Sequence, residues 1–513
     1  MNYLNKLKTG ISMNDIMGKF ERGAGILLHP TSLPSKYGIG ELGGKIFDFI
    51  DFLADTKQKY WQILPLGPTG YGDSPYQSFS SFAGNPLLLS IELLIEMQII
   101  DESKIDLPEF SSKSVEYGRV ISFKDHILKL AYNEFQDSSS HPQDEFSEYK
   151  DSQDKWLQQY AVFMTLKANT GLKPWYEWPE QYQNPDNPEI QQFIHDHRDE
   201  VDYYQFLQYL FQMQWDAVHT YASQKGISII GDIPIYVAYD SADTWGNQSL
   251  YLMDESGGLK YVSGVPPDYF SATGQLWGNP IYNWEKCEEE GFQFWTKRVS
   301  RTLELVDLIR IDHFRGFEAY WQVPAEATTA IDGKWVEGPG ESIFKQLRKN
   351  LGDLPLIAED LGVITKPVTE LRKSFGMPGM KILQYAFSKS KDSTNGYLPH
   401  NYEENTIVYS GTHDNDTSMG WWATAPREIK EHFIQYTDSD QTDIISDMMR
   451  LGHSSVADVS MLPMQDLLRK KSSSRMNFPG KAFGNWQWRF DFHELKEDWK
   501  SELLEMTETY KRY

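Results

Sequence analysis

Cysteine is almost absent from this chain of 513 residues, because Cys287 is the only one. An intrachain disulfide and a zinc site built on several cysteines are therefore excluded. Long apolar runs are also missing, since no stretch approaches the roughly 18 uninterrupted apolar residues of a membrane-spanning helix. Residues 1–20 contain scattered lysines but no continuous apolar core, which predicts that there is no signal peptide. We therefore expect a cytoplasmic protein.

Basic residues are scarce relative to acidic ones. The chain has 49 Lys and Arg against 73 Asp and Glu, and its formal net charge is −24 at pH 7. Such a surface repels the phosphates of nucleic acids and anionic lipids, so we expect neither nucleic acid nor a membrane as a partner. Aromatic residues, in contrast, make up 14% of the chain, with 16 Trp and 29 Tyr. Their flat apolar faces and polar edges suit the C–H faces of sugar rings.

Eight short apolar runs, each followed by polar or turn residues, recur along the chain, and helical patterns separate most of them. They cover residues 25–30, 60–66, 227–235, 308–317, 356–362, 381–387, 406–416 and 457–462. Alternating strands and helices form parallel sheets, and eight such units predict an α/β fold of the (β/α)8 TIM-barrel type. A doubly wound open sheet is the alternative. It usually has a glycine-rich phosphate loop after its first strand, and residues 29–44 contain no G-x-G-x-x-G motif.

Two long insertions interrupt the barrel pattern, within what we expect to be a single catalytic domain of residues 1–513. Residues 87–200, after the second strand, have a mostly helical pattern with a polar break at 136–154. Residues 239–290, after the third strand, contain two loops rich in Gly, Pro and aromatic residues. A further loop of this kind, at residues 67–86, follows the second strand, where such loops commonly bind ligands.

Four of the expected strands end in carboxylates, namely Asp232, Asp312, Glu359 and Asp414. In a barrel, these side chains converge on one cleft at the carboxyl ends of the strands. Arg310 lies two residues before Asp312 and therefore on the same face of the strand. Because a neighbouring guanidinium favours the ionised form of a carboxyl group, we expect Asp312 to be an anion at neutral pH and a suitable nucleophile.

Glu359 has a different predicted environment, since it follows the apolar residues 356–358. Burial without a cation raises the pKa of a carboxyl group, which suits a general acid. The next residue, Asp360, should face the opposite way, into the layer between the barrel and its helices. Two carboxyl groups with separated pKa values on either side of one bond are the machinery of glycoside chemistry.

Each carboxylate also has a structural interpretation. Asp312 could form only an ion pair at a strand end, Asp232 could cap the following segment, and the buried glutamate could simply be hydrogen-bonded. For His413 and Asp414 the alternative is a pair of metal ligands. A metal site would need a further group of histidines, and His29 is the only other histidine at a strong strand end. We therefore expect no metal.

Three segments of the chain closely resemble the amylomaltases, which are 4-α-glucanotransferases of glycoside hydrolase family 77 in the α-amylase clan. They are residues 310–316 (RIDHFRG), 358–362 (AEDLG) and 411–416 (GTHDND). The resemblance extends from residues 29–34 (HPTSLP) to residues 484–489 (GNWQWR), and thus over nearly the whole chain. Only the first twenty or so residues and parts of the helical insertion lack it.

The resemblance implies a retaining 4-α-glucanotransferase that needs no cofactor. It makes Asp312 the nucleophile, Glu359 the general acid/base and Asp414 the stabiliser of the transition state. It also implies that residues 268–277 form a lid over the glycosyl-enzyme. The residues that it places in the substrate cleft are Tyr76, Asp232, Asp268, Trp277, Arg310, His413 and Asn485. The implied partners are malto-oligosaccharides and other α-1,4-glucans, with glucose as an acceptor.

Two other classes of function remain open from the sequence. An α-amylase-type hydrolase of α-1,4-glucans would use the same carboxylates. A glycan-binding protein without turnover would have a similar cleft, although the presence of all three carboxylates argues against it. The products formed from maltotriose separate these classes.

Overall fold

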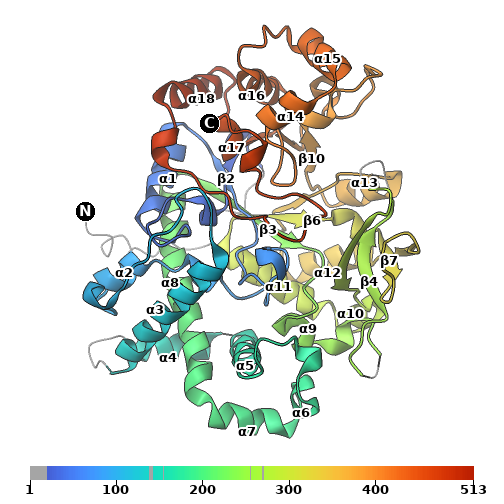
Figure 1. Ribbon diagram of the computed structural model, residues 1–513. Coiled ribbons are helices and arrows are strands. Elements are labelled where there is room, and N and C mark those ends of the chain that lie inside the picture. The colour runs from blue at the N-terminus through green and yellow to red at the C-terminus, as the bar shows by residue number, and fades with distance from the viewer. Residues whose placement is uncertain (1–19, 138–142, 154, 255, 268–270) are drawn as a thin grey trace.

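The computed structural model describes residues 20–513 except 138–142, 154, 255 and 268–270 (Figure 1). Its centre is a parallel sheet of eight strands in the order β10-β11-β12-β1-β2-β3-β6-β9. The strands are β1 (Gly23–Leu27), β2 (Tyr60–Gln62), β3 (Ser228–Pro234), β6 (Leu308–Asp312), β9 (Leu356–Ala358), β10 (Gly379–Ile382), β11 (Thr406–Tyr409) and β12 (Val459–Pro463).

The two ends of this strand order lie next to each other. The backbone N–H of Ala358, in β9, donates to the carbonyl of Pro378, just before β10, at 3.0 Å. The sheet therefore curls into a nearly closed barrel, and the predicted (β/α)8 fold is confirmed. All eight predicted strands are present. The sixth predicted strand, β10, begins at Gly379, two residues earlier than predicted. Its first residue is a glycine, which has no side chain and so does not extend the apolar pattern.

Helices surround the barrel and bury one apolar face each. In α1 (Gly44–Asp55) the buried face holds the isoleucines and phenylalanines that predicted this helix. The other helices of the barrel layer include α11 (Gln293–Leu305), α12 (Glu341–Leu351), α13 (Lys366–Ser374), α16 (Ile444–Ser454) and α18 (Glu497–Thr509). The connections contain the helices α9 (Ala242–Gly246), α10 (Trp284–Glu289), α14 (Ser418–Thr424), α15 (Arg427–Thr437) and α17 (Met464–Leu467). Within the described part of the chain, every helix is too short or too polar to cross a membrane.

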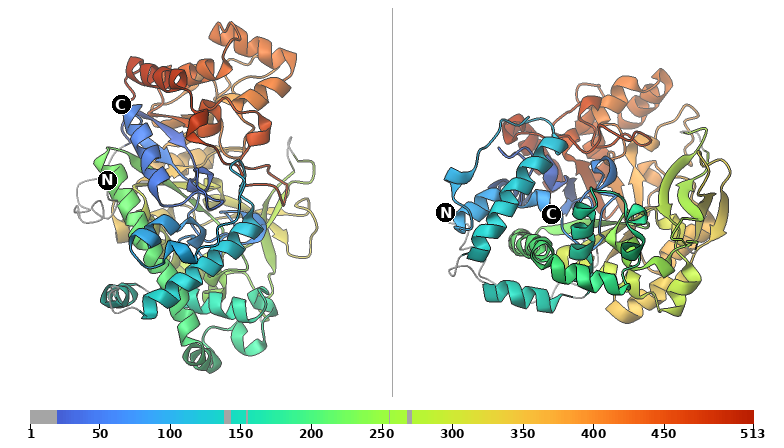
Figure 2. Two further views of the ribbon diagram at one scale, coloured as in Figure 1. Left: turned by 60° about the vertical axis from the view of Figure 1, so that its left-hand side comes forward. Right: turned by 60° about the horizontal axis from the view of Figure 1, so that its bottom comes forward.

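Between β2 and β3 the chain forms a helical region that extends from the left side to the bottom of Figure 1. It contains α2 (Ile91–Glu96), α3 (Tyr117–Asp137), α4 (Gln143–Ser152), α5 (Trp156–Asn169), α6 (Glu180–Gln183) and α7 (Pro188–Asp196). The long helix α8 (Arg198–Gln224) then returns to the barrel, as Figures 1 and 2 show. The prediction that a polar break interrupts the helices at residues 136–154 was wrong, because α4 lies within this range. Phe146 is the only buried residue of α4, and one apolar residue makes no helical pattern.

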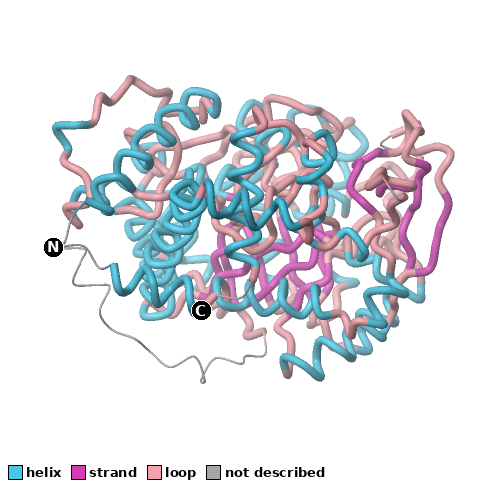
Figure 3. Tube along the Cα trace, turned by 90° about the horizontal axis from the view of Figure 1, so that it is seen from below, coloured by secondary structure: helices cyan, strands magenta, loops and turns pink. Residues whose placement is uncertain are grey.

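A second, antiparallel sheet lies beside the barrel in the order β5-β4-β7-β8. Figure 3 shows its strands apart from those of the barrel. One hairpin, β4 (Tyr261–Val265) and β5 (Gln275–Pro280), belongs to the insertion after β3. The other, β7 (Ala319–Pro324) and β8 (Lys334–Glu337), follows β6 and was not predicted from the sequence. The small sheet is therefore built from two separate stretches of chain.

Candidate active site

Arg310 holds two carboxylates at the carboxyl ends of neighbouring strands. Its Nη2 donates to Oδ1 of Asp312 at 2.9 Å, and its Nη1 donates to Oδ2 of Asp232 at 2.5 Å. The parallel register of β3 and β6 places Asp232 directly opposite Arg310, so the two side chains meet inside the barrel. The contact that was predicted between Arg310 and Asp312 is present.

Glu359 follows β9, the next strand of the barrel wall. Its Oε2 accepts the backbone N–H of His313 at 2.8 Å, and its Oε1 accepts that of Leu361 at 3.0 Å. His313 adopts a left-handed backbone conformation with φ of 54°, which is uncommon for a residue other than glycine. This turn at the end of β6 directs the backbone N–H of His313 to Glu359 and links the strand that carries Asp312 to the neighbouring carboxyl group.

Asp360 points away from Glu359, as the sequence predicted. Its Oδ2 lies 3.1 Å from Nε of Arg372, which belongs to α13. Its Oδ1 accepts the backbone N–H of Met380 at 2.7 Å. Asp360 is therefore a structural residue of the layer between the barrel and its helices.

The pKa values of Asp312 and Glu359 are both raised. Burial raises the pKa of Asp312 to about 7, although the Arg310 guanidinium opposes this shift. Burial raises the pKa of Glu359 to about 8, and the nearby charge of Asp312 adds to the rise. The sequence predicted an anion at neutral pH from the guanidinium alone, and burial opposes the effect of the guanidinium on the pKa of Asp312. Because the two carboxyl groups are buried beside each other, they titrate as a coupled pair.

A chain of polar contacts connects Asp232 to Asp414. The hydroxyl of Tyr76 donates to Oδ2 of Asp232 at 2.7 Å and lies 3.0 Å from Nε2 of His413. Because the phenol gives its proton to Asp232, its oxygen accepts from His413, which places a proton on Nε2. The same Nε2 lies 3.3 Å from Oδ2 of Asp414. Burial lowers the pKa of His413, so the ring stays neutral.

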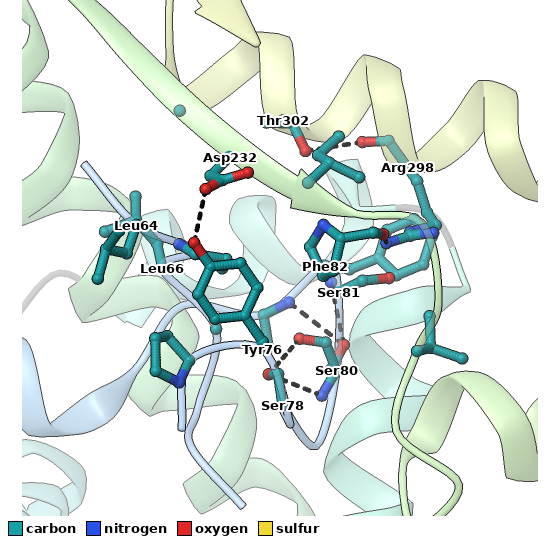
Figure 4. A pocket seen from close by; sticks show the side chains of 18 of the residues that line it. Leu64, Leu66, Tyr76, Ser78, Ser80, Ser81, Phe82, Asp232, Arg298 and Thr302 are labelled. Atoms are coloured by element: carbon teal, nitrogen blue, oxygen red, sulfur yellow. Dashed lines mark hydrogen bonds between the residues drawn. The ribbon is translucent and has the colours of Figure 1, made fainter. Parts of the chain in front are cut away.

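Asp232 borders a small pocket between the barrel and the loop after β2 (Figure 4). Tyr76 and Asp232 lie on one side of this pocket, and Arg298 of α11 lies on the other. The Oδ1 atom of Asp232 is buried and has no hydrogen-bond partner among the described residues. The carboxylate of Asp232 is thus fixed through Oδ2 alone, by Tyr76 and Arg310.

Trp277 brings the small sheet to the end of β6. Its ring packs edge-on against that of His313, with centroids 4.8 Å apart and planes at 88°. Its indole N–H donates to Oε1 of Gln275 at 3.3 Å. Asp268, the other cleft residue predicted in this insertion, lies outside the described residues.

Asn485 makes its contacts within its own loop. Its Nδ2 donates to the carbonyl of Lys481 at 2.8 Å, and its Oδ1 accepts the N–H of Phe478 at 3.0 Å. These two bonds brace residues 478–485 and do not join Asn485 to the carboxylates. Within the described residues, no group of three or more His, Cys, Asp or Glu side chains is arranged to hold a metal ion.

Sequence reasoning missed two residues that contact Asp414. Asn477 donates through Nδ2 to Oδ1 of Asp414 at 2.6 Å, and Arg475 donates through Nη2 to the carbonyl of Asp414 at 2.9 Å. Both lie in an irregular loop after α17, where no strand or helix pattern predicts the direction of a side chain. The only signal nearby was the motif at residues 484–489.

A family model described as 4-alpha-glucanotransferase matches residues 28–494. The chain belongs to the 4-alpha-glucanotransferase family. The 4-alpha-glucanotransferase of Thermus thermophilus is 45% identical over 500 residues, which cover 96% of this chain and 99% of that protein. The Synechocystis 4-alpha-glucanotransferase is 46% identical, over 96% of this chain and 98% of its own length.

Solved structures agree with membership of the 4-alpha-glucanotransferase family. An amylomaltase from Streptococcus agalactiae, determined in complex with acarbose, has a TM-score of 0.93 at 38% identity. This match covers 96% of the present chain and 100% of the Streptococcus chain. An amylomaltase from Corynebacterium glutamicum has a TM-score of 0.72 at 18% identity, over 95% of this chain and 75% of its own, and shares the fold.

Proposed function

We propose that the protein is a 4-alpha-glucanotransferase, which moves a segment of an α-1,4-glucan to the 4-hydroxyl of an acceptor glucan or of glucose. The observation that carries this proposal is the pair Asp312 and Glu359 at the ends of neighbouring strands. A guanidinium holds the first carboxyl group, backbone N–H groups hold the second, and burial raises the pKa of both. Membership of the family supports the choice of substrate.

In the first half of the reaction, Glu359 donates its proton to the leaving 4-oxygen while Asp312 attacks the anomeric carbon. The bond between the anomeric carbon and the 4-oxygen breaks, and a covalent glycosyl-enzyme forms. The Arg310 guanidinium binds Asp312 directly and favours its ionised form, so we assign the remaining proton of the coupled pair to Glu359.

In the second half, Glu359 removes the proton from the 4-hydroxyl of an acceptor, whose oxygen attacks the anomeric carbon and releases Asp312. Formation of the glycosyl ester has already removed the charge of Asp312, one of the two causes that raise the pKa of Glu359 most. The pKa of Glu359 therefore falls when this residue must act as a base. Two inversions at one carbon retain the α configuration.

The other cleft residues are proposed to bind the sugar. Asp414 would accept hydrogen bonds from ring hydroxyls, and these bonds strengthen as positive charge develops at the anomeric carbon. Arg310 and Asp232 fix the nucleophile, and Tyr76 with neutral His413 lines the same wall. Trp277 would cover the glycosyl-enzyme, and Asp268 and Asn485 keep their predicted roles in the substrate cleft.

We further propose that the chain is one catalytic barrel domain whose insertions at residues 87–200 and 239–290 shape the cleft. The second insertion carries the lid, and the contact between Trp277 and His313 supports this assignment. Such a cover favours transfer because it keeps water from the glycosyl-enzyme. The cytoplasmic location stays a proposal from the sequence, and fractionation of the source cells tests it.

Incubation with maltotriose tests the proposed activity. Every transfer breaks one linkage and makes another, so glucose and chains longer than maltotriose should appear together while the number of reducing ends stays constant. An α-amylase-type hydrolase would instead increase the reducing ends in step with glucose and form no longer chains. A binding protein would leave maltotriose intact. Either of these results would overturn the proposal.

A further inference from the structure

The loop after α17 clamps the dipeptide of His413 and Asp414 from one side. The backbone N–H of Asn477 donates to the carbonyl of His413 at 3.1 Å, and its side-chain Nδ2 donates to Oδ1 of Asp414 at 2.6 Å. Arg475 adds a bond from Nη2 to the carbonyl of Asp414 at 2.9 Å. Its Nε donates to the carbonyl of Asn477 at 3.1 Å, so the two clamping residues also hold each other.

The clamp separates the roles of the two carboxylate oxygens of Asp414. Oδ1 accepts from Asn477, whereas Oδ2 lies 3.3 Å from Nε2 of His413. The side chain of Asp414 is 45% exposed, so burial alone does not fix its torsion angles. The amide of Asn477 is an uncharged donor, and it therefore orients the carboxylate without neutralising it.

We propose that Asn477 is a positioning residue that holds Asp414 in the orientation needed to bind the sugar ring as charge develops. This inference rests on the proposed function, in which Asp414 stabilises the transition state. Asn477 needs no contact with the substrate, because it acts through Oδ1 of Asp414. A bond that matters only when the ring is distorted affects kcat more than KM.

The first test is Asn477→Ala in the full-length protein, with maltotriose as the substrate. Loss of a hydrogen bond to a charged group should lower kcat by roughly 10- to 100-fold, while KM changes by less than about threefold. The backbone bond from residue 477 to His413 remains in this variant, so the loop should keep its path. Thermal unfolding measured on the same sample checks that the fold is intact.

The second test, Asn477→Asp, separates positioning from mere support of the loop. The introduced carboxyl group faces Asp414, whose charge also acts on Asp312, Tyr76, Tyr385 and His413, while the Arg475 guanidinium binds its carbonyl. The wild type contains all of these groups, so the ratio of the two kcat values cancels their titration. Two adjacent carboxylates raise each other's pKa, so one of them binds a proton as the pH falls. Once protonated, the introduced carboxyl group donates to Asp414 as the amide does. The kcat of this variant relative to the wild type should therefore rise as the pH is lowered from about 8 to about 6.

Lys481→Ala is the matched control, since its exposed side chain lies in the same loop and its backbone bond to Asn485 is unaffected. It should keep the kcat of the wild type. Wild-type kcat in Asn477→Ala would overturn the inference, as would a relative kcat of Asn477→Asp that does not change with pH. Both outcomes leave the proposed function intact. The proposed function fails only if the wild-type protein itself does not convert maltotriose into longer chains.

Discussion

Two pairs of arginine and aspartate, each with a buried arginine, lie at the ends of neighbouring barrel strands, on opposite sides of the barrel wall. In the cleft, Arg310 binds Asp312, whose side chain is 29% exposed. Behind the wall, Arg372 binds Asp360, whose side chain is 8% exposed. Asp360 also accepts a backbone N–H, whereas Arg310 is the one hydrogen-bond donor to Asp312 that the described residues provide. An ion pair does not by itself mark a catalytic group, because Asp360 also has one. The feature that distinguishes Asp312 is that part of its carboxyl group remains accessible for reaction.

The largest expected effect is that of Asp312→Asn. An amide is a poor nucleophile at the anomeric carbon, so transfer from maltotriose should fall by on the order of 10⁴-fold or more, the scale seen when a covalent nucleophile is removed. Mass spectrometry should detect no glycosyl-enzyme. If the variant still forms the covalent intermediate, Asp312 is not the nucleophile and the contrast with Asp360 disappears.

Glu359→Gln should rank second and should depend on the donor. With maltotriose, loss of the general acid should lower kcat by about 10²- to 10⁴-fold. With a glycosyl fluoride, whose leaving group needs less protonation, the loss should be much smaller. The ratio of the two rates is the measurement, and equal losses with both donors would show that Glu359 is not the acid.

The same substitution behind the wall, Asp360→Asn, should affect stability instead of chemistry. It removes the charge that pairs with the buried Arg372, which keeps its bond to the carbonyl of Met377, and this should lower the free energy of unfolding by about 3–5 kcal/mol. Denaturant unfolding measures this loss, and kcat per folded molecule should stay within about threefold of the wild type, because Asp360 does not face the cleft. A large drop in kcat with unchanged stability would contradict the assignment of Asp360 to a structural role.

The smallest expected effect is the change of kcat/KM with pH, which tests Asp312 and Glu359 together. Asp312 must be ionised, so activity should fall as the pH drops below about 7, and Glu359 must be protonated, so activity should fall above about 8. These limits belong to the pair and not to single residues. In Glu359→Gln, assayed with a glycosyl fluoride, the alkaline limb should vanish. Its persistence would assign that limb to another group.

The barrel was predictable because its eight strands are compact apolar runs that end in polar residues. The orientations of Asp312 and Asp360 followed from the alternation of side chains along an extended chain. The pKa of Asp312 did not, because it depends on the balance between burial and the Arg310 guanidinium, and the extent of burial is set by the folded structure. Asn477 was also out of reach, since it meets Asp414 across 63 residues of chain through an irregular loop.

The hairpin of β7 and β8 was missed for a related reason. Its partner strand, β4, lies in a different insertion, and a pairing of this kind leaves no local pattern in the sequence. The helix α4 was missed because Phe146 is its only buried residue. Elements that are held mainly by contacts with distant segments are the ones that a single sequence conceals.

The two origins of the small sheet matter for protein engineering. A chimaera that exchanges only residues 239–290 with a relative would import β4 and β5 but keep the native β7 and β8. The foreign edge of β4 would then have to match residues 321–324 of its new host in register. Trp277, which reaches the end of β6 from this sheet, would be displaced by any mismatch. Grafts meant to change product length should therefore move both hairpins together.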